Sequence, residues 1–257
     1  AGYKAVASNL SDIAAMGGIP THIVLSTAIA PQMEMDDLQS LYKGIKDICQ
    51  QYHVNIIGGD TVMAKESMVI TVAAFGEIEA GRAICRSGAK PGDVIGVSHT
   101  IGDSAGGLDV LLQGIDGFPM LKKAHQLPEP QISLGRLLVQ FHGHSLNDIS
   151  DGLASESNEI AQASQADLII DREAVPCSGE LRQWAAKTGK NIWSYVFNGG
   201  EDYELIFTMA PADFKMLQQQ CPYITRIGHV EKGEGKVLLQ DDGVQTVLPK
   251  TGWNHFQ

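Results

Sequence analysis

Acidic side chains gather in residues 145–153, SLNDISDGL, where a predicted strand runs into a predicted helix. Asp148, Ser150 and Asp151 place three oxygen-bearing side chains within four positions. A helix N-terminus attracts anions, so two fixed carboxylates there would repel a phosphate unless metal cations came with it. Mg²⁺ prefers carboxylates together with substrate phosphates and keeps some of its water. This stretch therefore indicates a phosphate site that works through magnesium.

Three further stretches combine acids with small residues. Asp12 lies in ASNLSDIAAMGG, on one face of an Ala-rich predicted helix together with Asn9. Asp60 is predicted to end a strand in IIGGDT, where two glycines let the backbone approach a ligand closely. GGEDYEL at 199–205 places two acids before an apolar strand. Strand ends beside helices are where α/β folds bind ligands, so these segments are candidates for one shared site.

Each of these acids, taken alone, also fits a structural role. Asp12 fits a solvated surface charge, Asp60 a turn residue and Asp151 a helix N-cap. The metal hypothesis depends on their recurrence in a chain that has neither a GxxxxGK[ST] loop nor a GxGxxG turn. Without a glycine and lysine cradle, we expect ATP to be held through Mg²⁺ ions on the aspartates.

The segment GDSAGG at 102–107 is close to the Gly-Asp-Ser-Gly-Gly of trypsin-like proteases. Ala105 breaks that motif, and the flanking pattern of strand then helix does not fit a β-barrel protease. We interpret the segment as a glycine-rich turn in which Asp103 or Ser104 caps the following helix.

Composition narrows the classes of partner. The chain has 257 residues and a formal net charge of −11 without a basic cluster, which disfavours nucleic acid and anionic membranes. No apolar run approaches the roughly 18 residues of a membrane span. The four cysteines form no CxxC pair, a pattern typical of a reducing compartment, so we expect a cytoplasmic protein.

Hydrophobic periodicity predicts alternating helices and strands in two halves. In the first half we expect helices up to residue 16 and over 35–52, and strands over 22–30, 54–61 and 67–79. The loop RSGAKPGD, 86–93, is the predicted boundary, giving domains 1–88 and 89–257. In the second half we expect strands over 93–98, 146–150, 166–171, 203–210, 223–230 and 236–242, and helices over 104–114, 132–142, 152–164, 178–188 and 211–221. This alternation favours an α/β fold of sheets packed with helices.

At these motifs the chain resembles the thiamine-monophosphate kinase family, within the larger group of aminoimidazole ribonucleotide synthetase-like enzymes. The matching stretches are ASNLSDIAAMGG, NIIGGDT, RSGAKPGD, GDSAGGL, LPEP, NDISDGLASE, NGGEDYELIFT and GWNHF, in order along almost the whole chain. The resemblance implies the two-domain α/β (α+β) fold of that group with mixed sheets. It further implies a homodimer, with a barrel built across the two first domains, and ATP-dependent phosphorylation of thiamine monophosphate to the diphosphate.

The resemblance also implies roles for individual residues. The implied Mg²⁺ ligands are Asp12, Asp60, Asp148 and Asp151, of which Asp60, Asp148 and Asp151 are the expected catalytic group. The implied ATP contacts are Tyr42, Gly59, Asp60, Arg86 and Ser150. Glu201 and Trp253 are the implied contacts to the thiamine moiety. Because the acceptor is itself a phosphate, the transfer needs alignment and charge neutralisation more than a strong general base.

The chain departs from the family at its start. The family carries an upstream acidic segment with further metal ligands, and this sequence begins at Ala1 after the corresponding point. We therefore expect a chain that keeps most of the fold, binds fewer Mg²⁺ ions and turns over poorly. Two alternatives stay open: another ATP-using enzyme of the larger group, such as a synthetase that activates an amide, and a nucleotide-binding fragment without turnover.

Overall fold

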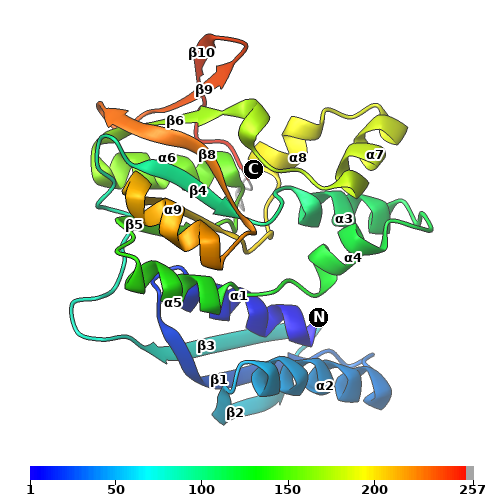
Figure 1. Ribbon diagram of the computed structural model, residues 1–257. Helices are drawn as coiled ribbons and strands as arrows, with labels where there is room; N and C mark the ends of the chain where they lie inside the picture. Colours follow the sequence, from blue (N-terminus) through cyan, green and yellow to red (C-terminus); the bar gives the residue numbers. More distant parts are fainter. Residues whose placement is uncertain (253–257) are drawn as a thin grey trace.

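The first structural unit is a small sheet covered by two helices. In the computed structural model, which describes residues 1–252, the sheet has the order β2-β1-β3, with β1 parallel to β2 and antiparallel to β3. Figure 1 shows this unit at the bottom, in blue and cyan. Its elements are α1 (Gly2–Ala14), β1 (Ile19–Ile29), α2 (Met35–Gln51), β2 (Asn55–Met63) and β3 (Val69–Glu77).

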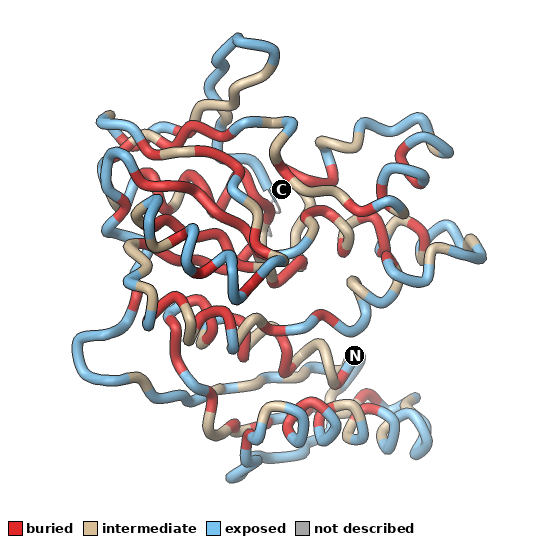
Figure 2. The backbone as a smooth tube through the Cα atoms, in the orientation of Figure 1, coloured by how far each residue is buried: buried red, intermediate tan, exposed pale blue. Residues whose placement is uncertain are grey.

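Side chains along β1 alternate between the two faces of the sheet, and the buried ones mark the face that the helices cover. Ile23, Leu25 and Thr27 are buried, and the apolar faces of α1 and α2 pack on this side. The intervening residues point to the opposite face, where Ser26 is exposed. No described element covers that face, and β2 is exposed at all nine of its positions. The exposed sheet is visible as pale blue strands in Figure 2.

The second unit is a seven-stranded mixed sheet of order β10-β9-β6-β8-β4-β7-β5, in which only β6 and β9 pair in parallel. Its strands are β4 (Val94–Ser98), β5 (Ser145–Asp148), β6 (Ala166–Asp171), β7 (Leu205–Met209), β8 (Ile224–Lys232), β9 (Val237–Asp241) and β10 (Val244–Val247). Its helices are α3 (Asp103–Leu112), α4 (Pro119–Gln126), α5 (Ile132–Gln140), α6 (Leu153–Ser164), η1 (Arg172–Ala174), α7 (Gly179–Thr188), α8 (Ile192–Asn198) and α9 (Pro211–Gln220).

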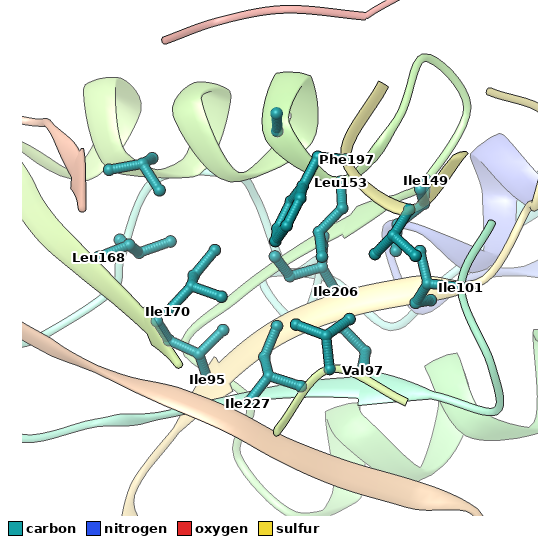
Figure 3. Close-up of a cluster of buried hydrophobic side chains, with 14 of the residues drawn as sticks. Ile95, Val97, Ile101, Ile149, Leu153, Leu168, Ile170, Phe197, Ile206 and Ile227 are labelled. Carbon is teal, nitrogen blue, oxygen red and sulfur yellow. The ribbon is translucent and has the colours of Figure 1, made fainter. Parts of the chain in front are cut away.

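Two hydrophobic clusters sandwich the central strands of this sheet. Branched side chains of β4, β6, β7 and β8 meet α6 and α8 in the larger cluster, which Figure 3 shows. On the opposite side, Phe207 and Phe214 join β7 to α9, and the same cluster reaches Ala15 after α1. The two units therefore share packed contacts through α1 and α5 (Figure 1). These contacts hold Asp12 beside the second unit.

The α/β architecture with mixed sheets confirms the predicted fold class. The predicted boundary at 88/89 falls in the connection between β3 and β4 and stays a prediction. The sequence did not predict α4, α8, η1 or β10. It also ended a strand too early at Asp60, because β2 continues to Met63. Gly59 lies inside that strand, where a Cβ would overlap the carbonyl oxygen of Leu25, so the glycine serves close strand packing instead of a turn.

Candidate active site

Two pockets are lined by neighbouring parts of residues 146–151, which comprise the end of β5 and the segment that follows it. The first, here named the Asp148 pocket, has a volume of about 440 Å³. It is lined by side chains from α1, from the connection after β3 and from β5: Asp12, Ala15, Met16, Ile84, Cys85, Arg86, Ser87, Leu146, Asn147, Asp148 and Ala163. Three of the predicted site residues, Asp12, Arg86 and Asp148, therefore share one hollow.

The Asp148 carboxyl is the buried acid of this pocket. It ends β5, is 4% exposed, and accepts a 2.7 Å hydrogen bond from the Ser11 hydroxyl on α1. Burial, together with the neighbouring Asp12 carboxylate, raises the pKa of Asp148 to about 6. Burial also raises the pKa of Asp12, which the Arg86 guanidinium partly offsets. Two carboxylates that disfavour each other's charge in a partly dry pocket are suited to a cation.

The donor set fits Mg²⁺ in the way that kinase sites use it. Within residues 1–252, no three His, Cys, Asp or Glu side chains are close enough together to hold a metal ion. The protein therefore offers the pair Asp12 and Asp148, and Mg²⁺ commonly completes such a pair with water and substrate phosphates. Arg86 lies beside the pair, with its Nε 3.1 Å from both Asn147 Oδ1 and Glu159 Oε2.

Asp60 and Gly59 on β2 and Tyr42 on α2 belong to the first unit, and none of them lines the Asp148 pocket. The strand register places Asp60 opposite Ser26, on the face of the sheet that the helices leave open. The Tyr42 hydroxyl lies on the other face, 3.0 Å from Thr27 Oγ1 and 3.1 Å from Thr61 Oγ1. Within a single chain, the structure thus brings together Asp12 and Asp148 but not Asp60.

The second pocket, here named the Glu201 pocket, has a volume of about 550 Å³. Ser150 and Asp151 line it together with Glu201, so it holds the other predicted site residues that the structure describes. Its remaining lining comes from α3, α4, α8 and the segment before β7: Ala105, Leu108, His125, Tyr195, Asn198, Gly199, Gly200 and Tyr203. Trp253 lies outside the described residues.

Left-handed backbone conformations position the Glu201 carboxylate. Glu201 and Tyr203 have φ values of 67° and 54°, which cost energy in residues that carry a Cβ. Hydrogen bonds to the segment after β5 hold them there, from Glu201 N to Ser150 O at 2.7 Å and from Tyr203 N to Ile149 O at 2.9 Å. Gly200 allows this approach, because a Cβ at that position would lie 2.5 Å from Ser150 O.

A buried acid that the sequence reading missed joins the two pockets. Glu156, in the first turn of α6, is 3% exposed. Its carboxyl group accepts hydrogen bonds from the Asp151 backbone N–H at 3.2 Å, from the Ser150 hydroxyl at 3.4 Å and from the Asn147 side-chain amide. Burial, followed by the nearby Glu159 carboxylate, raises the pKa of Glu156 to about 8. One side chain thus ties down the segment that carries both Asp148 and Asp151.

The N-terminus of α3 is capped by a residue from a distant part of the chain. Neither Asp103 nor Ser104 caps it, contrary to the prediction. Instead the fully buried Asp202 accepts hydrogen bonds from Gly102 N at 2.7 Å and from Ser104 N at 3.0 Å. Asp103 accepts from the Thr100 and Ser178 hydroxyls, each at 2.6 Å. Asp151 likewise does not cap α6, whose N-cap is Gly152, so its carboxylate stays available to the pocket.

Comparisons with known proteins identify the fold and the family of this chain. The family model for the N-terminal domain of AIR synthase related proteins matches residues 1–78, and the model for their C-terminal domain matches residues 90–240. A structure of AaThiL complexed with AMPPCP and TMP superposes with a TM-score of 0.88 at 34% identity, covering 99% of this chain and 80% of that one. The crystal structure of thiamine monophosphate kinase from Aquifex aeolicus gives a TM-score of 0.85 at 33% identity, covering 95% and 81%.

Curated relatives carry the same name. The thiamine-monophosphate kinase of Bacillus subtilis is 41% identical over 100% of this chain and 81% of its own length. The enzyme of the same name from Escherichia coli K12 is 36% identical, over 99% of this chain and 79% of its own length. Identity at this level across nearly the whole chain shows that the chain belongs to the thiamine-monophosphate kinase family.

Proposed function

We propose that this protein transfers the γ-phosphoryl group of ATP directly to thiamine monophosphate, giving thiamine diphosphate. The observation that carries the proposal is that neighbouring residues of one short acidic segment line two pockets. Asp148 lines the first pocket and Asp151 the second, and Glu156 fixes the backbone between them. Two negatively charged reactants can therefore meet at the same acidic segment.

In this proposal the Asp148 pocket takes the nucleotide phosphates. Asp12 and Asp148 would hold Mg²⁺, which supplies charge neutralisation between the ATP phosphates and the acceptor phosphate. Asp148 is largely ionised at neutral pH, since its pKa is about 6, and an ionised carboxylate is what a metal ligand requires. Arg86 adds a fixed cation at the mouth of the pocket, where it can pair with phosphate oxygens.

The Glu201 pocket takes the thiamine moiety. Glu201 offers a carboxylate to the permanently cationic thiazolium ring, and Trp253 is proposed as a second contact. Asp151 and Ser150 lie on the same pocket wall, where the acceptor phosphate would meet the nucleotide. Asp151 is proposed as a ligand of a further Mg²⁺ ion, and Ser150 as a contact to ATP. The transfer needs no strong base, because the acceptor is a phosphate oxygen that already carries charge.

We further propose that the protein is a cytoplasmic homodimer. Support for dimerisation comes from the open face of the β2-β1-β3 sheet, where Val62, Val69 and Phe75 are each at least half exposed. Asp60, Gly59 and Tyr42 belong to the same unit and are proposed to complete the ATP site. No helix in residues 1–252 combines the length and the apolar character needed to cross a bilayer, and the four cysteines are unpaired.

The direct test is release of ADP in a coupled assay with Mg-ATP and three acceptor conditions. We expect ADP with thiamine monophosphate, and only background with thiamine or with no acceptor. ADP release that ignores the acceptor would contradict the proposal. Mg-ATP binding without any ADP release would favour a nucleotide-binding module without turnover.

A further inference from the structure

A lysine from the first unit forms an ion pair with the carboxylate of Glu201, which lines the Glu201 pocket. Lys4, in the first turns of α1, places its Nζ 2.9 Å from Glu201 Oε2. The lysine side chain is only 18% exposed, so its ammonium is held against the pocket and is not free in solvent. Because Lys4 belongs to the first unit and Glu201 to the segment before β7, this ion pair joins the two units. No role for Lys4 follows from the proposed function.

The same ammonium has a second acceptor within reach. Its Nζ lies 3.3 Å from Nδ1 and 3.5 Å from Nε2 of His125, on α4. Burial, followed by the charge of Lys4 itself, lowers the pKa of His125, so the imidazole stays neutral and keeps an acceptor lone pair. The Ser104 hydroxyl lies 3.2 Å from Nδ1 and supports the ring. Lys4 can therefore release Glu201 and still remain hydrogen-bonded.

These contacts have a consequence for the ligand. Without Lys4, the pocket wall would carry two uncompensated carboxylates, Asp151 and Glu201. With Lys4 in place, a neutral ring that enters the pocket has to leave the ion pair intact or break it without compensation. A ring with its own fixed positive charge can take the place of the ammonium on the carboxylate. The exchange costs little, since one ion pair replaces another.

We propose that Lys4 sets the affinity of this pocket for cationic rings: its ammonium holds the place of such a ring on Glu201 and keeps only its contact with His125 when the ring binds. The inference rests on the proposed function only in that the ligand is a permanently cationic heteroaromatic ring. It adds that the chain itself balances the charge of Glu201 in the empty pocket, and that a cationic ring has to compete with Lys4 for this carboxylate whereas a neutral ring does not.

Calorimetric titration of the metal-free protein with two probes tests this directly. The probes are thiamine, which has the cationic ring but no phosphate, and its neutral thiophene isostere. Replacing Lys4 with Met removes the competing cation, so thiamine binding should strengthen about three- to fivefold, the size expected for a partly exposed ion pair. Binding of the neutral isostere should stay within about twofold of the unchanged protein, because it never competed for the carboxylate.

Further variants separate the role of Lys4 from other causes of a change in affinity. Lys215→Met on α9 removes the same charge from an exposed position outside the pocket and should leave both affinities unchanged. Glu201→Gln removes the carboxylate itself and should abolish the preference for thiamine over the isostere. If Lys4→Met folds poorly, which a thermal melt would show, Lys4→Gln removes the same charge with a polar side chain and should give the same gain in thiamine affinity.

Weaker thiamine binding by Lys4→Met, or an equal change for both probes, would overturn the inference, because either result makes Lys4 a direct contact or a structural residue. Failure of the proposed function would give a different result from failure of the inference about Lys4. An unchanged protein that binds neither thiamine nor thiamine monophosphate contradicts both, whereas one that binds them but shows no gain in Lys4→Met contradicts only the role of Lys4.

Discussion

At the scale of single residues, the site contains buried carboxyl groups whose ionised form destabilises the fold. Asp148 is 4% exposed, and its raised pKa means that the folded chain disfavours its charge. Glu156 is buried beside it and shows the same direction of shift. A fold that only needed to be stable would place amides or apolar groups here. The cost is understandable if cations arrive with the substrate.

Replacing Asp148 with Asn should therefore stabilise the metal-free protein and abolish its function. The folded-state pKa of about 6 lies above the unfolded value of about 3.8, so ionisation destabilises the fold as pH rises between these values. At pH 7.5 the amide removes this cost, which is at most about 3 kcal/mol, and it can still accept from Ser11. At pH 4 the two melting temperatures should converge, because Asp148 is then protonated.

The functional half of this prediction uses the same variant. Loss of a metal-binding carboxylate should lower kcat/KM for Mg-ATP by about 100-fold or more. Mg-ATP should raise the melting temperature of the unchanged protein but not that of Asp148→Asn. Asp116→Asn, the same change at an exposed loop position, serves as the control and should alter neither quantity. Unchanged nucleotide affinity in Asp148→Asn would remove the metal role of this residue.

At the scale of elements, the strongly periodic segments could be predicted from the sequence, and the short ones could not. The helix over 152–164 and the strand over 166–171 appear almost as predicted. The helix α8, IWSYVFN, has aromatic and β-branched residues that do not favour a helix, and tertiary packing decides its form. The contacts of Asp202 with α3 span about a hundred positions, so no local pattern could reveal them.

The site, like the fold, could be predicted only in part from the sequence. The sequence pointed to acids at chain turns, and the structure gathers Asp12 with Asp148, and Asp151 with Glu201. It gave no signal for Lys4 or His125, since each becomes relevant only through contacts between elements distant in sequence. For Glu156 a weak signal existed: an acid in the first turn of a helix, five residues after Asp151. Its burial, which decides its role, is a property of the folded chain.

The close packing of α3 against α4 supports the Glu201 pocket, and replacing a glycine with alanine tests this packing. Gly107 on α3 lies so close to α4 that a Cβ would overlap the carbonyl oxygen of Leu121 and lie 3.0 Å from the Cβ of His125. Backbone cannot move aside as a side chain can. Gly107→Ala should destabilise the protein by about 2–3 kcal/mol and weaken binding of thiamine monophosphate, because α4 carries His125. Denaturant unfolding and calorimetry measure the two effects.

A matched glycine in another helix provides the control. Gly179 starts α7, and a Cβ there would meet no atom within 4 Å. Gly179→Ala should therefore leave stability unchanged or raise it by several tenths of a kcal/mol, since alanine restricts the unfolded chain. If Gly107→Ala were equally harmless, α3 and α4 would be packed more loosely than the structure shows, and the shape of the Glu201 pocket would not depend on their crossing.

At the scale of the whole molecule, the two units differ in how completely they bury their sheets. The seven-stranded sheet has a hydrophobic cluster on both faces. The three-stranded sheet has helices on one face only, and its open face combines Val62, Val69 and Phe75 with the predicted site residue Asp60. Exposed apolar side chains on an uncovered face of a sheet indicate an interface. A second copy of the chain seated there would bring Asp60 close to another molecule, which a single chain does not do.

This argument predicts the effect of a charge on the open face. The unchanged protein should have twice the 27.6 kDa chain mass in light scattering at micromolar concentration. Phe75→Glu should shift it to the monomer mass or weaken the dimer at least about tenfold, because an uncompensated charge would be buried in the interface. The melting temperature should change little when measured below the dissociation constant, since the Phe75 side chain is half exposed in the single chain.

Met216→Glu introduces the same charge at an exposed apolar position on α9, outside the open face, and should leave the mass doubled. We expect Phe75→Glu, but not Met216→Glu, to lower ADP release as well, because the proposed ATP contacts Gly59 and Asp60 lie in the same sheet. A Phe75→Glu protein that stays dimeric would place the interface elsewhere. A monomeric variant with full activity would show instead that each chain completes its ATP site without its partner and that Asp60 is not needed from across the interface.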